Sequence, residues 1–482
     1  MSHPHEHEQL HEEEDDAQLH DEDIVEVHED DDIEGHFEPM EEGYESDGDD
    51  AKYDGEIIIG APMPGEEEDM DMDGEGQEEL REDNSWGVNA LHASQQSVFA
   101  VALHPSFPNP PLAISGGEDD DGFLYCPIPS EGSSSSFNNE TFKPVRLTGH
   151  SDSVVSVGWN FDGEMVATGG MDGRVRVWRR VKGRKGTPPI DAAPTGSNPG
   201  EWKDWEFLTS LETGSEIQWL TWHPKGNVLA AGCEDSSVWL WNLPSGNTIT
   251  VLSSHTLPAT CGIFPPPNGR QLLTTSLDSS LILWEVSSST PIFKSSMFCP
   301  PNSPEVDPAE HGITALAVSP NGQIAAVGGA AGGVRIVGLE KGNILATLKG
   351  HAEGESIEAL TFIDVLGGAA GGKGVVLVSG GTDGKGFVWD VNTGRVRAEL
   401  QHDEPITSLA PHPAPNYHLL TSASADGTLK TWDVRTGALI STHKGHMGVV
   451  NGVAVASAPE GTDAKEVVVS AGDEGVSLIW KV

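Results

Sequence analysis

Short strand-like runs of apolar and polar residues, separated by turns, fill the sequence from about residue 86 onwards. Val154, Val157 and Trp159 mark one such run, and Ile217, Leu220 and Trp222 mark another. A period near two is typical of half-buried β-strands, and no long stretch has the 3.6-residue period of an amphipathic helix. Because glycine and other turn residues are dense between the runs, the pattern predicts an all-β protein of many short strands.

One ten-residue pattern recurs eight times in this region. It consists of two small residues, any residue, an acidic or small residue, a short polar turn and an alternating strand that ends on an aromatic residue. The fifth copy is degenerate, with Ala330 and Ala331 at its third and fourth positions and Val337 at its end. Such self-similarity indicates a repeat protein. The copies span residues 116–125, 169–178, 232–241, 275–284, 328–337, 380–389, 423–432 and 471–480.

A histidine, in three places as a Gly-His pair, precedes six of the copies: His150, His255, His311, His351, His402 and His446. Together with the terminal tryptophans, this pattern resembles the WD40 repeat over about residues 86–482. The resemblance implies blades of four antiparallel strands, stacked radially. We therefore expect an eight-bladed WD40 β-propeller over residues 85–482, preceded by a disordered acidic segment over residues 1–84.

The position of the eighth copy predicts how the ring closes. This copy ends at Trp480-Lys481-Val482, inside its third strand, so its fourth strand must come from elsewhere. Residues 85–92 precede the first inner strand and can supply it, which leaves only short protected edges. A seven-bladed ring is the alternative if the fifth copy is an insertion, but its inner strand, residues 313–318, is well formed.

The turn aspartates at the fourth position of the pattern are expected to be structural. They accept hydrogen bonds from the turn backbone and, as the resemblance implies, from the histidine of the same blade. These residues are Asp172, Asp235, Asp278, Asp383 and Asp426.

Charge divides the chain into two regions. The formal net charge is −49, and residues 1–85 hold 36 acidic but only two basic residues, a net of −34. The other 397 residues hold 40 acidic and 25 basic residues, a net of −15. A chain this acidic repels nucleic-acid phosphates and anionic membranes. We therefore expect a basic protein partner and no direct nucleic-acid or membrane binding.

Cysteine usage and the sequence ends favour a reducing compartment. The four cysteines form no C-x-x-C pair, which argues against zinc and disulfides. The first residues lack the features of a signal peptide, and no apolar run is long enough to span a membrane. We expect a monomer in the cytoplasm, with the nucleus as a second location.

No motif predicts an enzyme, a cofactor or a metal site. Residues 367–373 fit G-x-x-x-x-G-K, but Gly374 stands where a phosphate loop needs Ser or Thr, and a strand follows instead of a helix. Seven histidines in the acidic segment lack fixed ligand spacing, so weak adventitious metal binding is the better interpretation. The acidic segment itself is either a solubilising leader or a loose lure for a basic partner.

The loops that carry the Gly-His and turn-aspartate segments should share one rim of the propeller channel. Acidic residues dominate these positions, and Trp219 adds an aromatic beside them. Such a rim suits an Arg- or Lys-rich peptide through charge-assisted hydrogen bonds. The candidate client-binding residues are Glu118, Glu216, Trp219, Glu234, Glu355, Glu358, Asp403, Glu404 and Asp473.

Several strings are more specific than the repeat: residues 116–120, 217–224, 258–262 and 426–437. With the acidic leader they resemble the angio-associated migratory cell protein family. Its fungal members are dedicated chaperones that bind the basic N-terminal peptide of a nascent large-subunit ribosomal protein, L-ten or uL-sixteen, on an acidic propeller rim. The resemblance implies the same role here, with delivery to the pre-60S particle. A general WD-repeat scaffold in signalling or protein turnover remains the alternative.

Overall fold

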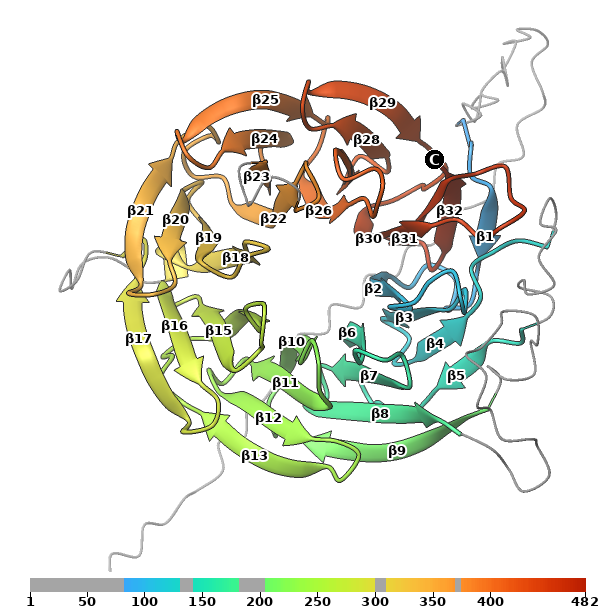
Figure 1. The fold of residues 1–482 in the computed structure, drawn as a ribbon. Helices are drawn as coiled ribbons and strands as arrows, with labels where there is room; N and C mark the ends of the chain where they lie inside the picture. The colour runs from blue at the N-terminus through green and yellow to red at the C-terminus, as the bar shows by residue number, and fades with distance from the viewer. Residues whose placement is uncertain (1–81, 131–141, 182–203, 300–308, 369–373) are drawn as a thin grey trace, which may run out of the picture. The chain divides into compact units, whose positions relative to one another are not determined.

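Eight four-stranded antiparallel sheets form the described part of the protein. The computed structural model describes residues 82–130, 142–181, 204–299, 309–368 and 374–482. One strand of each sheet lies nearest the centre, from β2 (Val98–Leu103) in the first blade to β30 (Val450–Ser457) in the last, and its successive neighbours in the sheet lie progressively further out (Figure 1). Each inner strand contacts the inner strands of both neighbouring sheets, and β2 contacts β30, so the ring is closed. The expected eight-bladed propeller is confirmed.

Each of the first four blades contains consecutive strands of the chain. In order they are β2 (Val98–Leu103), β3 (Ala113–Gly117), β4 (Gly122–Tyr125), β5 (Val145–Leu147); β6 (Val154–Trp159), β7 (Met165–Gly170), β8 (Arg174–Arg180), β9 (Trp205–Glu212); β10 (Ile217–Trp222), β11 (Val228–Cys233), β12 (Val238–Asn242), β13 (Asn247–Leu252); β14 (Ala259–Ile263), β15 (Gln271–Ser276), β16 (Ser280–Glu285) and β17 (Thr290–Ser296).

Blades five to seven follow the same plan, whereas the last blade takes its outer strand from the start of the propeller. These strands are β18 (Ile313–Val318), β19 (Ile324–Gly329), β20 (Val334–Gly338), β21 (Asn343–Leu348); β22 (Ile357–Asp364), β23 (Val375–Gly381), β24 (Lys385–Asp390), β25 (Arg395–Gln401); β26 (Ile406–Pro411), β27 (Leu419–Ser424), β28 (Leu429–Asp433), β29 (Ala438–His443); and β30 (Val450–Ser457), β31 (Glu466–Gly472), β32 (Ser477–Lys481), β1 (Gly87–Asn89). A 3₁₀ turn, η2 (Ala309–His311), precedes β18.

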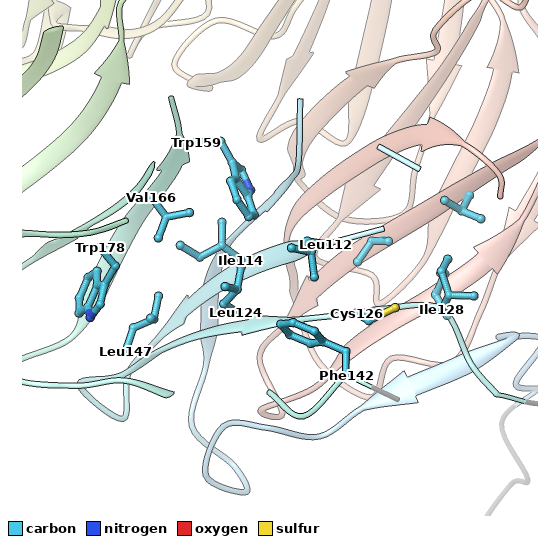
Figure 2. Packing of buried hydrophobic residues seen from close by; sticks show 13 residues of the cluster. Leu112, Ile114, Leu124, Cys126, Ile128, Phe142, Leu147, Trp159, Val166 and Trp178 are labelled. Atoms are coloured by element: carbon cyan, nitrogen blue, oxygen red, sulfur yellow. The ribbon is translucent and has the colours of Figure 1, made fainter. Parts of the chain in front are cut away.

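Apolar side chains pack between neighbouring blades rather than within one blade. Ile114 and Leu124 of the first blade share a cluster with Val166 and Trp178 of the second, and Figure 2 shows the two pairs facing one another. Burying a side chain of this size stabilises the fold by about 1.5–3 kcal/mol. Because each sheet leaves both faces apolar, a blade depends on both of its neighbours.

The N-terminal segment predicted to close the ring pairs with the eighth blade; we call residues 82–89 the strap. β1 pairs antiparallel with β32, with Gly87 opposite Ile479 and Asn89 opposite Ser477. Before β1, the Asn84 N–H donates to the Lys444 carbonyl at 3.1 Å, and the Lys444 ammonium lies 2.8 Å from Glu82. Residues 82–89 therefore join the start of the propeller to the seventh and eighth blades.

Two further expectations are settled by strand positions. The fifth copy forms a complete blade, β18–β21, so the seven-bladed alternative is wrong. The segment after the G-x-x-x-x-G-K match is strand β23, as expected, although residues 369–373 lie outside the described residues. The first three residues of the strap, 82–84, are the only described part of the predicted disordered segment 1–84.

The four cysteines are free thiols. Burial raises the pKa of Cys126 to about 12 and that of Cys261 to about 11, so neither is a reactive thiolate near neutral pH. No helix of the described residues has the length and apolar character needed to cross a bilayer.

The strap predicts a stability difference between two truncations. A chain starting at residue 90 should be less stable than a chain starting at residue 82 by about 3 kcal/mol or more, since it leaves the edge of β32 and its apolar neighbours exposed. Urea unfolding followed by tryptophan fluorescence measures the difference. Equal midpoints and slopes for the two truncations would contradict closure by residues 82–89.

Candidate functional site: an acidic rim

One backbone hydrogen bond, repeated in every blade, builds the rim. The N–H at the third position of the ten-residue pattern donates to the carbonyl of the residue just before the inner strand. Glu118 donates to Ser97 at 2.9 Å, and Glu234 donates to Glu216 at 3.0 Å. The turn between the second and third strands therefore lies beside the entry to the inner strand. The other pairs are Met171–Ser153, Leu277–Pro258, Ala330–Gly312, Thr382–Ser356, Ala425–Pro405 and Asp473–Val449.

Buried histidines hold these turns through hydrogen bonds made inside the blade. His402 Nδ1 donates to Asp426 at 2.9 Å, while its Nε2 lies 2.7 Å from Ser422 Oγ, which also accepts the Trp432 indole N–H at 2.9 Å. Although burial opposes ionisation, the bonds from His402 and Thr428 hold the pKa of Asp426 well below its usual value. The carboxylate thus stays charged and fastens the turn at neutral pH.

The same histidine contact occurs at three more of the expected turn aspartates. His150 lies 3.0 Å from Asp172, and His351 lies 3.0 Å from Asp383. His255 lies 3.7 Å from Asp278, with Ser280 Oγ between them in bonding distance of both. Their carboxylates are nearly buried, so they face into the blade and not towards solvent.

Asp235 is different, because no histidine precedes its blade. Its carboxylate accepts the N–H of Ser237 at 3.0 Å and the hydroxyl of Ser237 at 2.6 Å, while its own N–H donates to Ser215. Conversely, two acidic residues not assigned to this role from the sequence do bond a histidine. His92 lies 2.7 Å from Asp119, and His446 lies 2.5 Å from Glu474. Asp119 and Glu474 both occupy the fourth position of their repeat, so their place in the repeat could have identified them from the sequence.

The fifth blade corrects another expectation. His311 does not take the position of the blade histidine, and Ala331 offers no carboxylate. Phe298 occupies that position instead: a Cβ on Gly329 would lie 2.9 Å from its ring, just as a Cβ on Gly117 would meet His92. The local fold is kept by an apolar contact where the other blades use a polar one.

The rim carboxylates are accessible to a ligand. Six of the eight predicted ones are exposed, and Glu216 and Glu355 are half-buried. The exposed six are Glu118, Glu234, Glu358, Asp403, Glu404 and Asp473. Because the histidine-bonded turn aspartates point inwards, the rim residues supply most of the charge that a ligand would meet.

Two groups of these carboxylates are brought together, one across the boundary between the eighth and first blades and one within the third blade. Ser97 joins Glu118 to Asp473: its N–H donates to Glu118 at 3.0 Å and its hydroxyl donates to Asp473. Glu216 and Glu234 lie side by side, and their hydrogen bond is the main cause that raises the pKa of Glu216, with Asp152 contributing. Asp120, missed from the sequence, also has a raised pKa, caused by burial and then by Asp152 and the neighbouring aspartates.

Blades six and seven carry the remaining candidates. Glu355 accepts the Thr382 hydroxyl at 2.6 Å, and Glu358 is the extra residue of the bulge at the start of β22. Asp403 and Glu404 follow His402 in the loop before β26. With Asp152 at the entry of the second blade, the acidic side chains extend over blades six, seven, eight, one, two and three, which we call the acidic arc.

The expectation that Trp219 adds an aromatic surface to the rim is wrong. The residue is only 8% exposed and belongs to the core between the third and fourth blades. A Cβ on Gly262 of β14 would lie 2.0 Å from its indole ring. At the other seven blades the position of Trp219 holds a small residue and that of Gly262 holds Val or Leu, so the two blades have exchanged large and small residues.

The described residues contain no group of His, Cys, Asp and Glu arranged to hold a metal ion. What the site offers is a set of carboxylates in like-charge contact. Such groups favour a multivalent cation, above all guanidinium and ammonium groups that can accept several of them at once.

Comparisons with known proteins agree with this fold. The family model "WD domain, G-beta repeat" matches residues 142–179, 246–285 and 394–433, and the anaphase-promoting complex subunit 4 WD40 domain model matches residues 202–264. An uncharacterized WD repeat-containing protein of Schizosaccharomyces pombe is 30% identical over 387 residues, covering 80% of this chain and 84% of the relative. Human angio-associated migratory cell protein is 28% identical over 404 residues, covering 81% and 79%.

Ribosome assembly protein SQT1 of Saccharomyces cerevisiae is 26% identical over 405 residues, covering 80% of this chain and 84% of the relative. Its crystal structure superposes with a TM-score of 0.66 at 25% identity, covering 83% of this chain and 99% of that one. Chaetomium thermophilum Sqt1 bound to the N-terminus of the ribosomal protein L10 gives a TM-score of 0.65 at 27% identity, covering 83% and 100%.

The exchange at Trp219 predicts a compensating pair of mutations. Trp219→Ala should destabilise the propeller by about 3–5 kcal/mol, the usual cost of an emptied aromatic core site. Adding Gly262→Leu should recover part of the loss, because it restores the arrangement of the other blade interfaces. Chemical denaturation of the single and double mutants measures both effects; simple addition of two destabilising effects would contradict the exchange.

Proposed function

The chain belongs to the WD-repeat family and is related to angio-associated migratory cell protein and Sqt1, and on this basis we propose that it is a dedicated ribosomal-protein chaperone. It captures the basic N-terminal peptide of a nascent large-subunit ribosomal protein of the L10 type. It holds this client on the acidic arc until the client joins the pre-60S particle. Capture would take place where the client is translated, in the cytoplasm.

The observation that carries the proposal is the acidic arc itself. Eight carboxylates lie on five blades of the arc and Asp152 supplies the second blade, and the backbone bond between each turn and the entry to its inner strand holds them on one face of the ring. Guanidinium groups bind carboxylates through paired, charge-assisted hydrogen bonds. The relative that was crystallised with the N-terminus of L10 has the same fold, which supports the same class of ligand here.

Repulsion between neighbouring carboxylates of the unliganded arc also favours the binding of cations. Glu216 and Glu234 repel one another when both are ionised, and the hydrogen bond with Glu234 raises the pKa of Glu216. A bound arginine removes that repulsion and replaces the proton. The summed negative field also attracts a basic peptide before contact and raises its association rate at low salt.

The proposed role is binding and not catalysis. WD40 propellers are typically scaffolds, and the carboxylates that could act as acids or bases lie on an open rim rather than in a closed cleft. A general scaffold function is the second candidate, favoured by exposed apolar residues on the outer strands, such as Leu345 and Ile440, each 55% exposed. Purification from actively translating cells separates the two: a stoichiometric ribosomal protein supports the chaperone, and a mixture of signalling or ligase subunits supports the scaffold.

Charge reversal tests the arc directly. Glu216→Lys combined with Glu358→Lys should weaken binding of a synthetic L10 N-terminal peptide at least a hundredfold, because it places cations on opposite flanks of the arc. Binding by the unmodified protein should fall steeply with added salt. Isothermal titration calorimetry at two salt concentrations measures both.

The matched control reverses two exposed carboxylates in loops at the other ends of the strands, Glu340→Lys and Glu460→Lys. It changes the net charge equally and should leave affinity within a few-fold. If both double mutants lose affinity equally, net charge and not the arc is responsible; if neither does, the arc is not the site.

Binding should also be linked to pH. Because Glu216 retains a proton above the usual range of a glutamate and a cation displaces it, affinity should rise with pH through the mildly acidic range above about 4.5. Titrations at pH 5 in buffers of different ionisation enthalpy should detect proton release. Glu234→Gln should reduce the release, and an unchanged release in that mutant would assign the proton to another group.

A further inference from the structure

The described rim loops of the fourth blade carry no exposed carboxylate, and those of the fifth blade carry only Glu310. At the paired rim positions the fourth blade has Pro258 and Leu277, and the fifth blade has Gly312 and Ala330; these are uncharged, as are the pairs of the second, sixth and seventh blades, whose carboxylates lie in the adjoining loops instead. The turn aspartate Asp278 is held by its histidine, and Ala331 replaces the equivalent residue in the fifth blade. Glu310 lies in the described part of the loop that enters β18, and its side chain is exposed.

A cation lies in this part of the ring. Arg335 of β20 places its guanidinium carbon 5.1 Å from the centre of the Phe298 ring. Phe298 is itself held on the turn, since a Cβ on Gly333 would lie 2.8 Å from it and its N–H donates to Ser279 Oγ at 2.7 Å. In the first and sixth blades this pair is a histidine below an aromatic residue, so the fifth blade has replaced both members.

Arg335 has no acidic partner among the described residues. Its Nε is buried without an acceptor, and no ion pair joins it to Glu310 or to any other described carboxylate. Burial alone lowers its pKa, with no compensating charge. Arg146 bonds Asp121 and Arg435 bonds Asp433, whereas Arg176, at the same repeat position of the second blade, also has a buried Nε without an acceptor but lies near the charge of Asp172.

An unpaired cation in an otherwise acidic ring is a repulsive element for a basic ligand. Specific interfaces use such elements to reject wrong arrangements as well as attractive ones to favour the right one. A uniformly acidic ring would let a Lys- and Arg-rich peptide bind in many registers of similar energy. A positive residue at one blade penalises every register that brings a lysine or arginine there.

We propose that Arg335, supported by Phe298, sets the register of the client peptide by excluding basic residues from the fifth blade. The segment of the client that crosses this blade lacks lysine and arginine and offers its backbone carbonyls, or a carboxylate, to the guanidinium. This inference rests on the proposed function, because it concerns the same ligand on the same rim.

A lysine scan of the peptide tests the register. The probe is a synthetic peptide of the L10 N-terminus, with each uncharged residue replaced in turn by lysine. With the unmodified protein, one or two adjacent positions should lose at least fivefold in affinity, and the others should stay equal or tighten. With Arg335→Gln the loss at those positions should disappear, and with Arg335→Glu it should become a gain.

Two variants control for structure. Arg335→Lys keeps the charge and should keep the penalty. Arg176→Gln removes an arginine in the same kind of setting, 4.4 Å from the Phe207 ring but within the acidic arc beside Asp172, and should leave the penalised positions unchanged.

The outcomes separate the two proposals. A penalty that persists in Arg335→Gln, or a scan with no penalised position, overturns the role of Arg335 while leaving capture on the arc intact. Failure of the unmodified peptide to bind the unmodified protein overturns both.

Discussion

The contact between each buried histidine and its turn carboxylate is the constraint on which the rim depends. It lies at the junction of three elements: the loop entering the blade, the second strand through Ser or Thr, and the turn before the third strand. Where the tryptophan of that third strand also bonds the hydroxyl, as Trp389 and Trp432 do, all four parts move as one body. The loops that carry the rim carboxylates therefore have little freedom, and the carboxylates are already in place when a ligand arrives.

Preorganisation of this kind has an electrostatic cost, which the rest of the fold must offset. Holding Glu216 against Glu234, and Asp120 among other aspartates, stores repulsion that a ligand-free protein would otherwise relax. The apolar clusters between blades supply the opposing free energy, and together they occupy every interface around the ring. The fold can hold an acidic rim because the apolar contacts between blades supply the stability that the repulsion between carboxylates removes.

Periodicity made most of the fold predictable from the sequence, whereas the exceptions needed contacts that no local pattern contains. Eight registers of one pattern, with the missing fourth strand of the last, were enough to place β18 and to assign residues 85–92 to the closing strand. The inward role of Asp426 followed from its repeat position. Trp219 did not follow, because its burial depends on Gly262 in the next blade, and only an alignment of inner strands reveals that exchange. The replacement of His311 by Phe298 was hidden for a similar reason: the substitute lies thirteen residues earlier in the chain.

Departures from the repeat also carry the most information about what a repeat protein binds. A ring of identical blades has no beginning, so a linear peptide laid on it has no preferred register. The present ring breaks its symmetry in two ways that concern charge: the carboxylates gather over six blades, and the fifth blade presents Arg335 with no carboxylate partner among the described residues. An acidic surface alone would give affinity for any basic peptide, which is a hazard for a chaperone among many basic ribosomal proteins. Affinity and selectivity thus come from different residues, the first from the carboxylates of the arc and the second from Arg335 in the fifth blade, where Phe298 takes the place of the histidine.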